Sequence, residues 1–414
     1  MVGEWCDITL GDFVALQRGH DLTESERRNG RVPVMGSAGQ NGYHDTALAK
    51  GPGIVIGRSG ASFGQVHFSK KDFWPHNTGL YVTDFKGNDP LFAYYFLKAL
   101  DFDRFNSGSA QPSLNRNFIY PIPIRVPKPI EQKAIAVVLG ALDDKIELNR
   151  RMNSTLEAMA RALFQSWFVD FDPVRAKTDG RQPEGMAAET AALFPDALEH
   201  TADGSLLPRG WLKTNLGKEV QFLTGFTFKS EFFTDSPPGV RVARGMNVKE
   251  GEFFWGSQAR YWPEITPELE QYRLQSGDVL IGMDGSKVGK NWVRVRASDL
   301  PCLLVQRVAR LRPACSIGEN FIWIAVGSPT FRYYVDAVKT GTSIPHISGG
   351  QIKSFEFVRP PKNDNRIFKC FESLVAPLSA QMDKNHAELE TLVALRDALL
   401  PKLLSGELSV TETH

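Results

Sequence analysis

The sequence predicts a mixed α/β protein in which one architectural unit occurs twice: two similar globular domains and two long antiparallel coiled-coil helices, related by a pseudo-two-fold axis. The first observation is that residues recur at displacements that grow along the chain, from 206 to 225, 233 and 236 positions. The second is a change of hydrophobic period, from short runs in each domain to a heptad spacing after it. The recurring pairs include Trp5 with Trp211, Gly19 with Gly225, Gly60 with Gly285, Gly108 with Gly341 and Asn149 with Asn385.

Each predicted domain is a series of short strands with one helix. Residues 5–128 alternate apolar runs with Gly, Asn and Pro, which predicts strands at 53–57 and 79–82 and a helix near 90–100. Each copy is long enough to form a core of its own. The second copy predicts the same strands and helix at 279–282, 306–311 and 321–339.

Two segments have a heptad seam, in which seam positions are separated by alternating steps of four and three residues. The first seam runs from Ile135 to Trp167 and the second from Phe371 to Leu403. Because the seams correspond at a displacement of 236 residues, we expect the two helices to pair antiparallel. A helix of about 35 residues is about 50 Å long, so the pair predicts a spacer between the domains.

Three asparagines occupy seam positions at which leucine would be more stabilising: Asn149, Asn153 and Asn385. Polar seam residues can fix the register and orientation of a helix pair at a cost in stability. The alternative is that these asparagines lie on a solvated end of the pair.

The composition predicts where the parts begin and end. Residues 171–206 are rich in Pro and Gly, which is typical of a linker, with one short helix near 187–194. The last residues are expected to be disordered. The predicted parts are a first domain at 1–128, a long helix at 129–170, a linker at 171–206, a second domain at 207–362, a long helix at 363–408 and a tail at 409–414.

The overall composition is that of an ordinary globular protein, with 42% hydrophobic and 23% charged residues in 414. The first residues do not resemble a signal peptide, and no run reaches the ~18 apolar residues that a membrane-spanning helix needs. The four cysteines form no CxxC pair. We therefore expect a cytoplasmic protein that does not contact a membrane.

The net charge of +1 is distributed unevenly along the chain. Residues 1–128 and 205–362 carry +2 and +7, whereas residues 129–204 and 363–414 carry −5 and −3. This distribution of charge favours phosphate contacts by the globular domains and protein contacts by the helices. Chance variation is the alternative, and it stays open above all for the first domain.

The sequence indicates no catalytic residue, no metal ligand and no cofactor bound by this chain. The segment 285–291 resembles a phosphate-binding loop, but Asp284 stands where a glycine is needed and Asn291 replaces Ser or Thr. The eight histidines are scattered without an i, i+4 pair on a helix, so a metal site is not expected.

Both copies contain two glycine-rich polar loops. The loop 57–65 is matched by 282–290, and the loop 107–115 by 340–348. Glycine allows close backbone approach to a ligand, and the neighbouring side chains can donate to phosphates or base edges. The alternative is a tight turn that binds nothing. The candidate contacts to DNA are Arg58, Ser59, Ser62, Gln65, Gln111, Asn115, Lys287, Lys290, Arg294, Ser343 and His346.

Residues 127–177 and the end of the chain resemble a known family. The runs PKPIEQKAIA at 127–136, LDDKIELN at 142–149 and LFQSWFVDFDP at 163–173 are similar to the central conserved region of the specificity subunits of Type I restriction–modification systems. The run LLPKLLSGE at 399–407 resembles their C-terminal conserved region. The resemblance covers the whole chain, with specific motifs in the helices and vague ones in the domains.

The resemblance implies a non-catalytic DNA-binding subunit with two target-recognition domains, each contacting one half of a bipartite asymmetric DNA target. The antiparallel helices would set the unread gap. Two methyltransferase (modification) subunits would dock on them and bring S-adenosylmethionine for adenine methylation, and two restriction/translocase subunits, using ATP and Mg²⁺, would complete the restriction form. The last helix has Glu388 and Arg396 where the first has Met152 and Ala160, so the two docking faces need not be equivalent.

Two hypotheses from other classes compete with this one. The first is a free-standing enzyme acting on DNA, which cleavage or methylation by the purified chain alone would favour. The second is a DNA-binding scaffold or repressor, which the absence of a co-purifying methyltransferase would favour.

Overall fold

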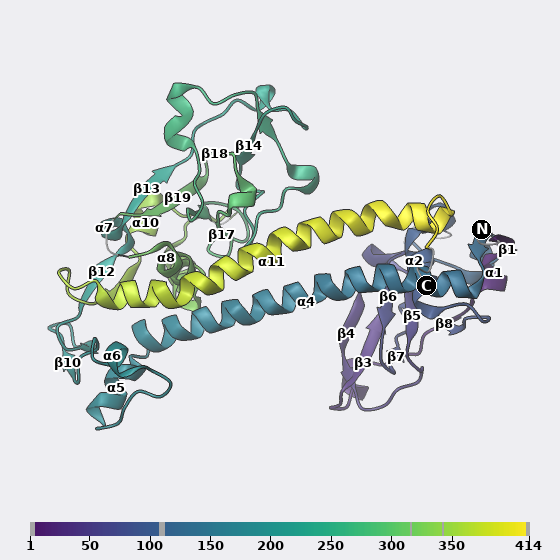
Figure 1. Ribbon diagram of the computed structural model, residues 1–414, viewed down its shortest axis with the longest axis horizontal. Coiled ribbons are helices and arrows are strands. Elements are labelled where there is room, and N and C mark those ends of the chain that lie inside the picture. The colour runs from purple at the N-terminus through teal and green to yellow at the C-terminus, as the bar shows by residue number, and fades with distance from the viewer. Residues whose placement is uncertain (1–4, 107–111, 315–316, 342, 411–414) are drawn as a thin grey trace. The chain divides into compact units, whose positions relative to one another are not determined.

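The computed structural model describes residues 5–106, 112–314, 317–341 and 343–410. The chain forms two compact units, each assembled from segments that are distant in the sequence. The first unit comprises residues 1–149 and 388–414, and the second comprises residues 150–387. Each unit therefore contains one globular domain and a part of both long helices, α4 (Pro129–Phe168) and α11 (Arg366–Ser405), which are drawn in blue and yellow in Figure 1.

The first domain is built from three small sheets and the helix α2. Its four-stranded sheet has the order β2-β8-β5-β6, its three-stranded sheet the order β4-β3-β7, and β1 pairs with β9. Only β3 and β7 are parallel among these named strands. The bounds are β1 Trp5–Thr9, α1 Leu10–Phe13, β2 Ala15–Arg18, η1 Glu24–Glu26, β3 Val32–Gly36, β4 Gly39–His44, β5 Gly53–Gly57, η2 Gly60–Ser62, β6 Val66–Ser69, β7 Trp74–Pro75, β8 Gly79–Asp84, α2 Pro90–Ala99, η3 Phe102–Phe105, α3 Arg116–Ile119 and β9 Pro123–Pro127.

The second domain repeats this topology. Its sheets have the orders β13-β19-β16-β17, β15-β14-β18 and β12-β20, and again β14 and β18 are parallel. The predicted fold class is thereby confirmed. The bounds are β12 Leu212–Asn215, α7 Leu216–Glu219, β13 Val220–Thr224, η4 Ser230–Phe232, β14 Val240–Ala243, η5 Gly256–Gln258, β15 Tyr261–Trp262, η6 Pro267–Tyr272, β16 Val279–Gly282, β17 Trp292–Arg294, η7 Ala297–Asp299, β18 Cys302–Leu304, β19 Val308–Pro313, α8 Glu319–Val326, α9 Pro329–Val338, α10 Gly349–Lys353 and β20 Glu356–Arg359.

The matching helix of the second domain differs from the single helix predicted within 321–339. The structure has two helices, α8 and α9, with Gly327 and Ser328 between them. The hydroxyl of Ser328 accepts a hydrogen bond from the amide of Phe331 at 3.1 Å, and Pro329 occupies the first helical position. Proline favours the first turn of a helix and interrupts a helix interior, so the chain starts a new helix here.

The segment predicted as a linker, 171–206, contains secondary structure and contributes to the core of the second unit. It forms α5 (Asp172–Thr178), α6 (Ala188–Ala191) and the strand β10 (Leu198–His200), which pairs with β11 (Leu206–Pro208). Phe171, Val174 and Phe194 are buried in the same core as the aromatic residues of α4 and α11. The Pro and Gly content indicated turns correctly, but it did not reveal that the apolar residues between them are sufficient to pack.

The core of each unit includes side chains from the long helices. In the second unit, Phe164 and Phe168 of α4 pack with Phe321 of α8 and with Phe368 and Phe371 of α11, and the rings of Phe168 and Phe368 are stacked at 5.4 Å. In the first unit, the core around α2 is completed by Leu403 of α11, which is buried. Partly buried residues from the same end of the chain pack against that core: Leu399, Leu400, Leu404 and Val410.

The two long helices pair antiparallel within each unit, as the heptad seams predicted. In the first unit Arg396 donates to Asp143 at 2.9 Å, and in the second unit Asn385 donates to the side-chain oxygen of Asn153 at 2.8 Å. Every predicted seam position from 135 to 167 and from 371 to 403 is buried or half-buried. The seam spacing therefore identified the packed face of both helices.

Candidate nucleic-acid interface

The two glycine-rich loops of the first domain lie side by side. Ser59 and Ser113 form an antiparallel bridge, and the amide of Leu114 donates to the carbonyl of Arg58 at 2.8 Å. The amide of Arg58 in turn donates to the carbonyl of Thr78 at 3.0 Å. Three segments are thus joined by backbone hydrogen bonds at the end of the four-stranded sheet.

The second domain has the same backbone arrangement at the corresponding residues. Asp284 and His346 form the antiparallel bridge, and the amide of Ile347 donates to the carbonyl of Met283 at 2.8 Å. The amide of Met283 donates to the carbonyl of Arg307 at 2.9 Å. Because the main chain supplies these bonds, the side chains at the same positions can differ completely.

The repeated glycines serve the geometry of the turn. A Cβ atom on Gly57 would lie 1.9 Å from the carbonyl oxygen of Ser62, and Gly64 has a φ of +73°. In the second copy Gly285 and Gly289 have φ of +99° and +85°. Residues with a Cβ atom are strained at such φ values. The alternative of a tight turn therefore explains the glycines, while any ligand contact depends on the residues between them.

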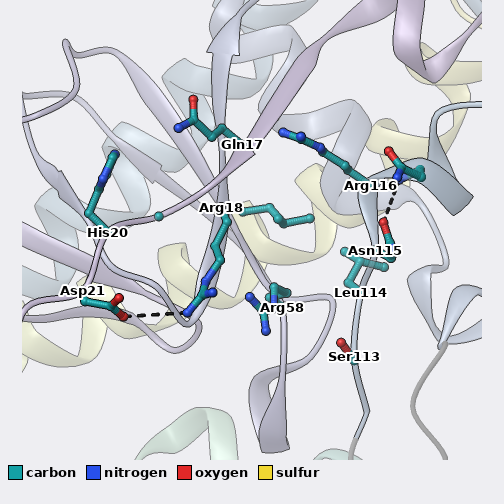
Figure 2. Close-up of a pocket in the computed structure, with 12 residues that line it drawn as sticks. Gln17, Arg18, His20, Asp21, Arg58, Ser113, Leu114, Asn115 and Arg116 are labelled. Carbon is teal, nitrogen blue, oxygen red and sulfur yellow. Dashed lines mark hydrogen bonds and ion pairs between the residues drawn. The ribbon is translucent and has the colours of Figure 1, made fainter.

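In the first domain these loops border a cavity of about 650 Å³ that contains several cationic side chains. Figure 2 shows Arg18 from the end of β2, Arg58 from the first loop and Arg116 from α3 around this cavity. One donor nitrogen of Arg116 binds the carbonyl of Leu16 at 2.7 Å. Arg18 lies 3.7 Å from Asp21, and both of these side chains are exposed. Gln17, His20 and Asn115 also line the cavity.

The other predicted residues of the first domain have different surroundings. Ser59 and Ser62 are half-buried in the loop, and Gln65 is exposed at its end. The side-chain oxygen of Asn115 accepts from the amide of Asn117 at 3.0 Å, so it caps α3 and only its amino group is left to donate outward. Gln111 lies outside the described residues.

The predicted residues of the second domain do not form one cluster. Lys287 is exposed on its loop, whereas Lys290 lines a different cavity, of about 730 Å³, together with Arg161 of α4 and Asp336 of α9. His346 shares a hydrogen bond of 2.9 Å with the hydroxyl of Thr340, which fixes its ring within the second loop. Ser343 is exposed near the tip of that loop.

Arg294 differs from the surface position that was expected for a DNA contact. It belongs to β17 and is buried, and it donates to Asp383 of α11 at 2.6 Å. Arg296 lies 3.6 Å from the same carboxylate. These arginines therefore attach the second domain to its long helix, and the guanidinium of Arg294 is already used within the protein.

The seam asparagines are hydrogen-bonded across the helix pair. Asn149 and Asn385 are buried, which is contrary to the alternative of a solvated end, and Asn153 is half-buried. Asn149 donates to Glu388 at 2.8 Å, and this hydrogen bond is the main reason that the pKa of Glu388 lies below its ordinary value, with Lys145 adding to it. Asn153 donates to the carbonyl of Met382 at 3.3 Å.

The predicted contacts did not include several polar residues that line the cavity, among them Gln17, Arg18, His20 and Arg116. In the sequence, the end of β2 was marked only by the recurrence of Gly19 as Gly225, which indicates a constrained backbone position. A Cβ atom on Gly19 would lie 2.2 Å from the carbonyl oxygen of His76, so the chain must pass close to that segment. The sequence indicated a constrained position there, but it did not indicate that the neighbouring side chains meet those of the two loops.

Comparison with known proteins agrees with this geometry. A family model of the Type I restriction modification DNA specificity domain matches residues 3–158. The matched segment contains the cavity of Figure 2 and continues into α4.

Curated relatives extend the resemblance along the chain. The Type I restriction enzyme HindI specificity subunit of Haemophilus influenzae is 25% identical over 353 residues, which cover 72% of this chain and 71% of that protein. The MjaIX specificity subunit of Methanocaldococcus jannaschii is 25% identical over 372 residues, with coverage of 87% and 78%. The EcoAI specificity subunit of Escherichia coli is 30% identical over 199 residues, with coverage of 47% and 33%. The predicted resemblance to Type I specificity subunits is confirmed.

A solved structure supports the fold. The crystal structure of the S subunit of a Type I restriction-modification system from M. genitalium has a TM-score of 0.61 at 18% identity, covering 97% of this chain and 96% of that one.

Among the residues that our structure describes, no helix has both the length and the apolar character needed to cross a membrane.

Proposed function

We propose that this chain is the non-catalytic DNA-reading subunit of a Type I restriction–modification system, and that each domain contacts one part of a bipartite asymmetric target. The observation that carries the proposal is the repeated backbone frame with different side chains in the two copies. Ser59 and Ser113 of one copy correspond to Asp284 and His346 of the other. Such a frame suits two domains that read different sequences, and the named relatives are specificity subunits.

The partners in this proposal are methyltransferase (modification) subunits that dock on the long helices, and restriction/translocase subunits that join through them. The cofactors, S-adenosylmethionine, ATP and Mg²⁺, belong to those partners. Exposed apolar side chains on both long helices support docking, because burial of apolar surface favours association. They include Ile130, Val137 and Leu148 on α4 and Leu374 and Leu395 on α11.

The helix pair in this proposal sets the unread gap between the two parts of the target. Its support is the seam itself, in which Asn149 in the first unit and Asn385 in the second each form a polar contact between α4 and α11. A fixed register gives a fixed spacing only if the pair is continuous, so a change in helix length is the direct test.

The experiment is to express the chain with the methyltransferase subunit of its host and to map methylated adenines by single-molecule sequencing. We expect methylation at one bipartite asymmetric motif. Adding one heptad to both helices, between residues 149 and 150 and between residues 387 and 388, is expected to lengthen the gap and leave both read parts unchanged. Methylation or cleavage by the purified chain alone would contradict the non-catalytic role, and an unaltered gap would contradict the role of the helices.

A further inference from the structure

The side chain of Arg58 occupies a position suited to reading a base. Its amide and carbonyl are both bonded to neighbouring segments, to Thr78 at 3.0 Å and to Leu114 at 2.8 Å. The residue is half-buried and its guanidinium lies within the cavity of Figure 2. A fixed backbone sets the point from which the side chain extends, so less conformational freedom is lost when Arg58 binds a base.

The charges around Arg58 favour a ligand that is rich in acceptors. Arg18, Arg116 and His20 line the same cavity, and Asp21 is the carboxylate among its lining residues. Asp21 lies 3.7 Å from Arg18. Among the residues that the structure describes, no ion pair is formed by Arg58. No described residue is seen to accept a hydrogen bond from the Arg58 guanidinium either, whereas one donor nitrogen of Arg116 is used by the carbonyl of Leu16.

We propose that Arg58 recognises a guanine in the part of the target that the first domain contacts; this inference rests on the proposed DNA-reading function. A guanidinium donates two parallel hydrogen bonds to O6 and N7 of guanine, which is the commonest specific arginine contact in the major groove. Arg18 and Arg116 are more exposed and lie at neighbouring edges of the cavity, where they serve the flanking phosphates.

The second domain lacks this arrangement at the corresponding positions. Met283 stands in place of Arg58, Thr224 in place of Arg18 and Gly349 in place of Arg116. Its nearby guanidinium, that of Arg307, is paired with Asp284 at 2.7 Å. The guanine contact is therefore assigned to the first domain alone, and the substitution that copies the second domain is Arg58→Met.

The test is to let the complex of this chain with its methyltransferase subunits methylate a randomised DNA library and to sequence the products. The variant Arg58→Met is expected to lower the preference for one guanine, in one half of the motif, about fivefold or more, because a bidentate pair contributes about 1–3 kcal/mol of discrimination. The other positions of the motif stay unchanged. The matched control is Arg104→Met, since Arg104 is 81% exposed on η3 and is paired with Asp101; it is expected to leave the motif unaltered.

Other outcomes would overturn the inference. An unchanged motif with an equal loss of methylation on all sequences would identify a phosphate contact, and a relaxed A·T position would identify a different readout. Arg58→Lys retains the charge without the paired donors, and it is expected to relax the same guanine even if Arg58→Met does not fold. A wild-type chain that directs no bipartite methylation would contradict the proposed function itself, whereas a wild-type motif that survives both substitutions would contradict only the role of Arg58.

Discussion

The two domains differ most sharply at one pair of corresponding buried positions. In the first domain these positions are occupied by Phe13 and Val126, and in the second by Glu219 and Arg359. The carboxylate and the guanidinium form an ion pair of 2.7 Å with each side chain only 2% exposed, and Thr214 donates to Glu219 at 3.0 Å. The same frame therefore accepts either an apolar pair or a charged pair, because its strands and turns are specified by backbone bonds rather than by this part of the core.

The largest expected effect comes from breaking this ion pair. Glu219→Ala or Arg359→Ala leaves one buried charge without its partner, which destabilises a protein by about 3–5 kcal/mol. Installing the residues of the first domain together, Glu219→Phe with Arg359→Val, is expected to cost much less or to stabilise. Thermal unfolding of the intact chain, followed by calorimetry, measures both. If the double variant is as unstable as either single variant, the second domain does not accept the apolar pair of the first domain at positions 219 and 359.

A smaller effect is expected at the buried seam asparagines, Asn149 in the first unit and Asn385 in the second, because their side-chain oxygens differ in hydrogen bonding. Among the described residues no donor reaches the buried side-chain oxygen of Asn149, whereas Asn385 accepts from Gln381 at 2.7 Å and donates to Asn153. Asn149→Leu is therefore expected to raise the free energy of unfolding by about 1 kcal/mol, and Asn385→Leu to lower it by a similar amount. Denaturant titration of both variants checks the sign. Equal changes would show that the two helix contacts are equivalent after all.

The smallest effect concerns a helix cap that each unit receives from a long helix. In the first unit the side chain of Gln132 accepts from the amide of Asp89 at 3.0 Å, next to α2, and in the second Glu372 accepts from the amide of Phe321 at 2.9 Å, in α8. Burial raises the pKa of Glu372 above its ordinary value of 4.5. The folded protein therefore holds this proton more tightly than the unfolded chain does, and stability is lost as the pH rises from about 4.5 through the raised pKa.

Glu372→Gln removes that titration and makes the second unit resemble the first. Relative to this variant, the wild type is expected to become less stable as the pH rises from 4.5 through the raised pKa of Glu372, with no further change above it. Melting temperatures of both proteins across this range test the sign. A difference that does not vary with pH would mean that Glu372 titrates normally in the folded protein.

The comparison of the domains also shows what the sequence could predict. Recurring residues and the heptad period revealed the duplication and the packed face of each long helix, since both depend on spacing. The net charge was less informative. The second domain carries +7, but Arg294, Arg307 and Arg312 are paired with Asp383, Asp284 and Asp278, so the net charge did not reveal which cations are free to contact a ligand.

Individual site residues were the least predictable. Arg58 was identified because it follows a glycine that recurs, whereas Arg18 and Arg116 lie in segments about 40 and 60 residues from it and reach the same cavity only through the tertiary fold. Arg294 and Lys290 have the residue types of nucleic-acid contacts, yet their strand and loop face α11 and α9. Residue type and spacing do not reveal which neighbour covers a strand.

The first unit depends on residues from the end of the chain. Leu403 is buried in its core, and Leu399, Leu400, Leu404 and Val410 pack against that core. During synthesis these side chains leave the ribosome after the whole second domain. The core of the first domain therefore stays incomplete, with an apolar surface exposed, until the second domain has been translated.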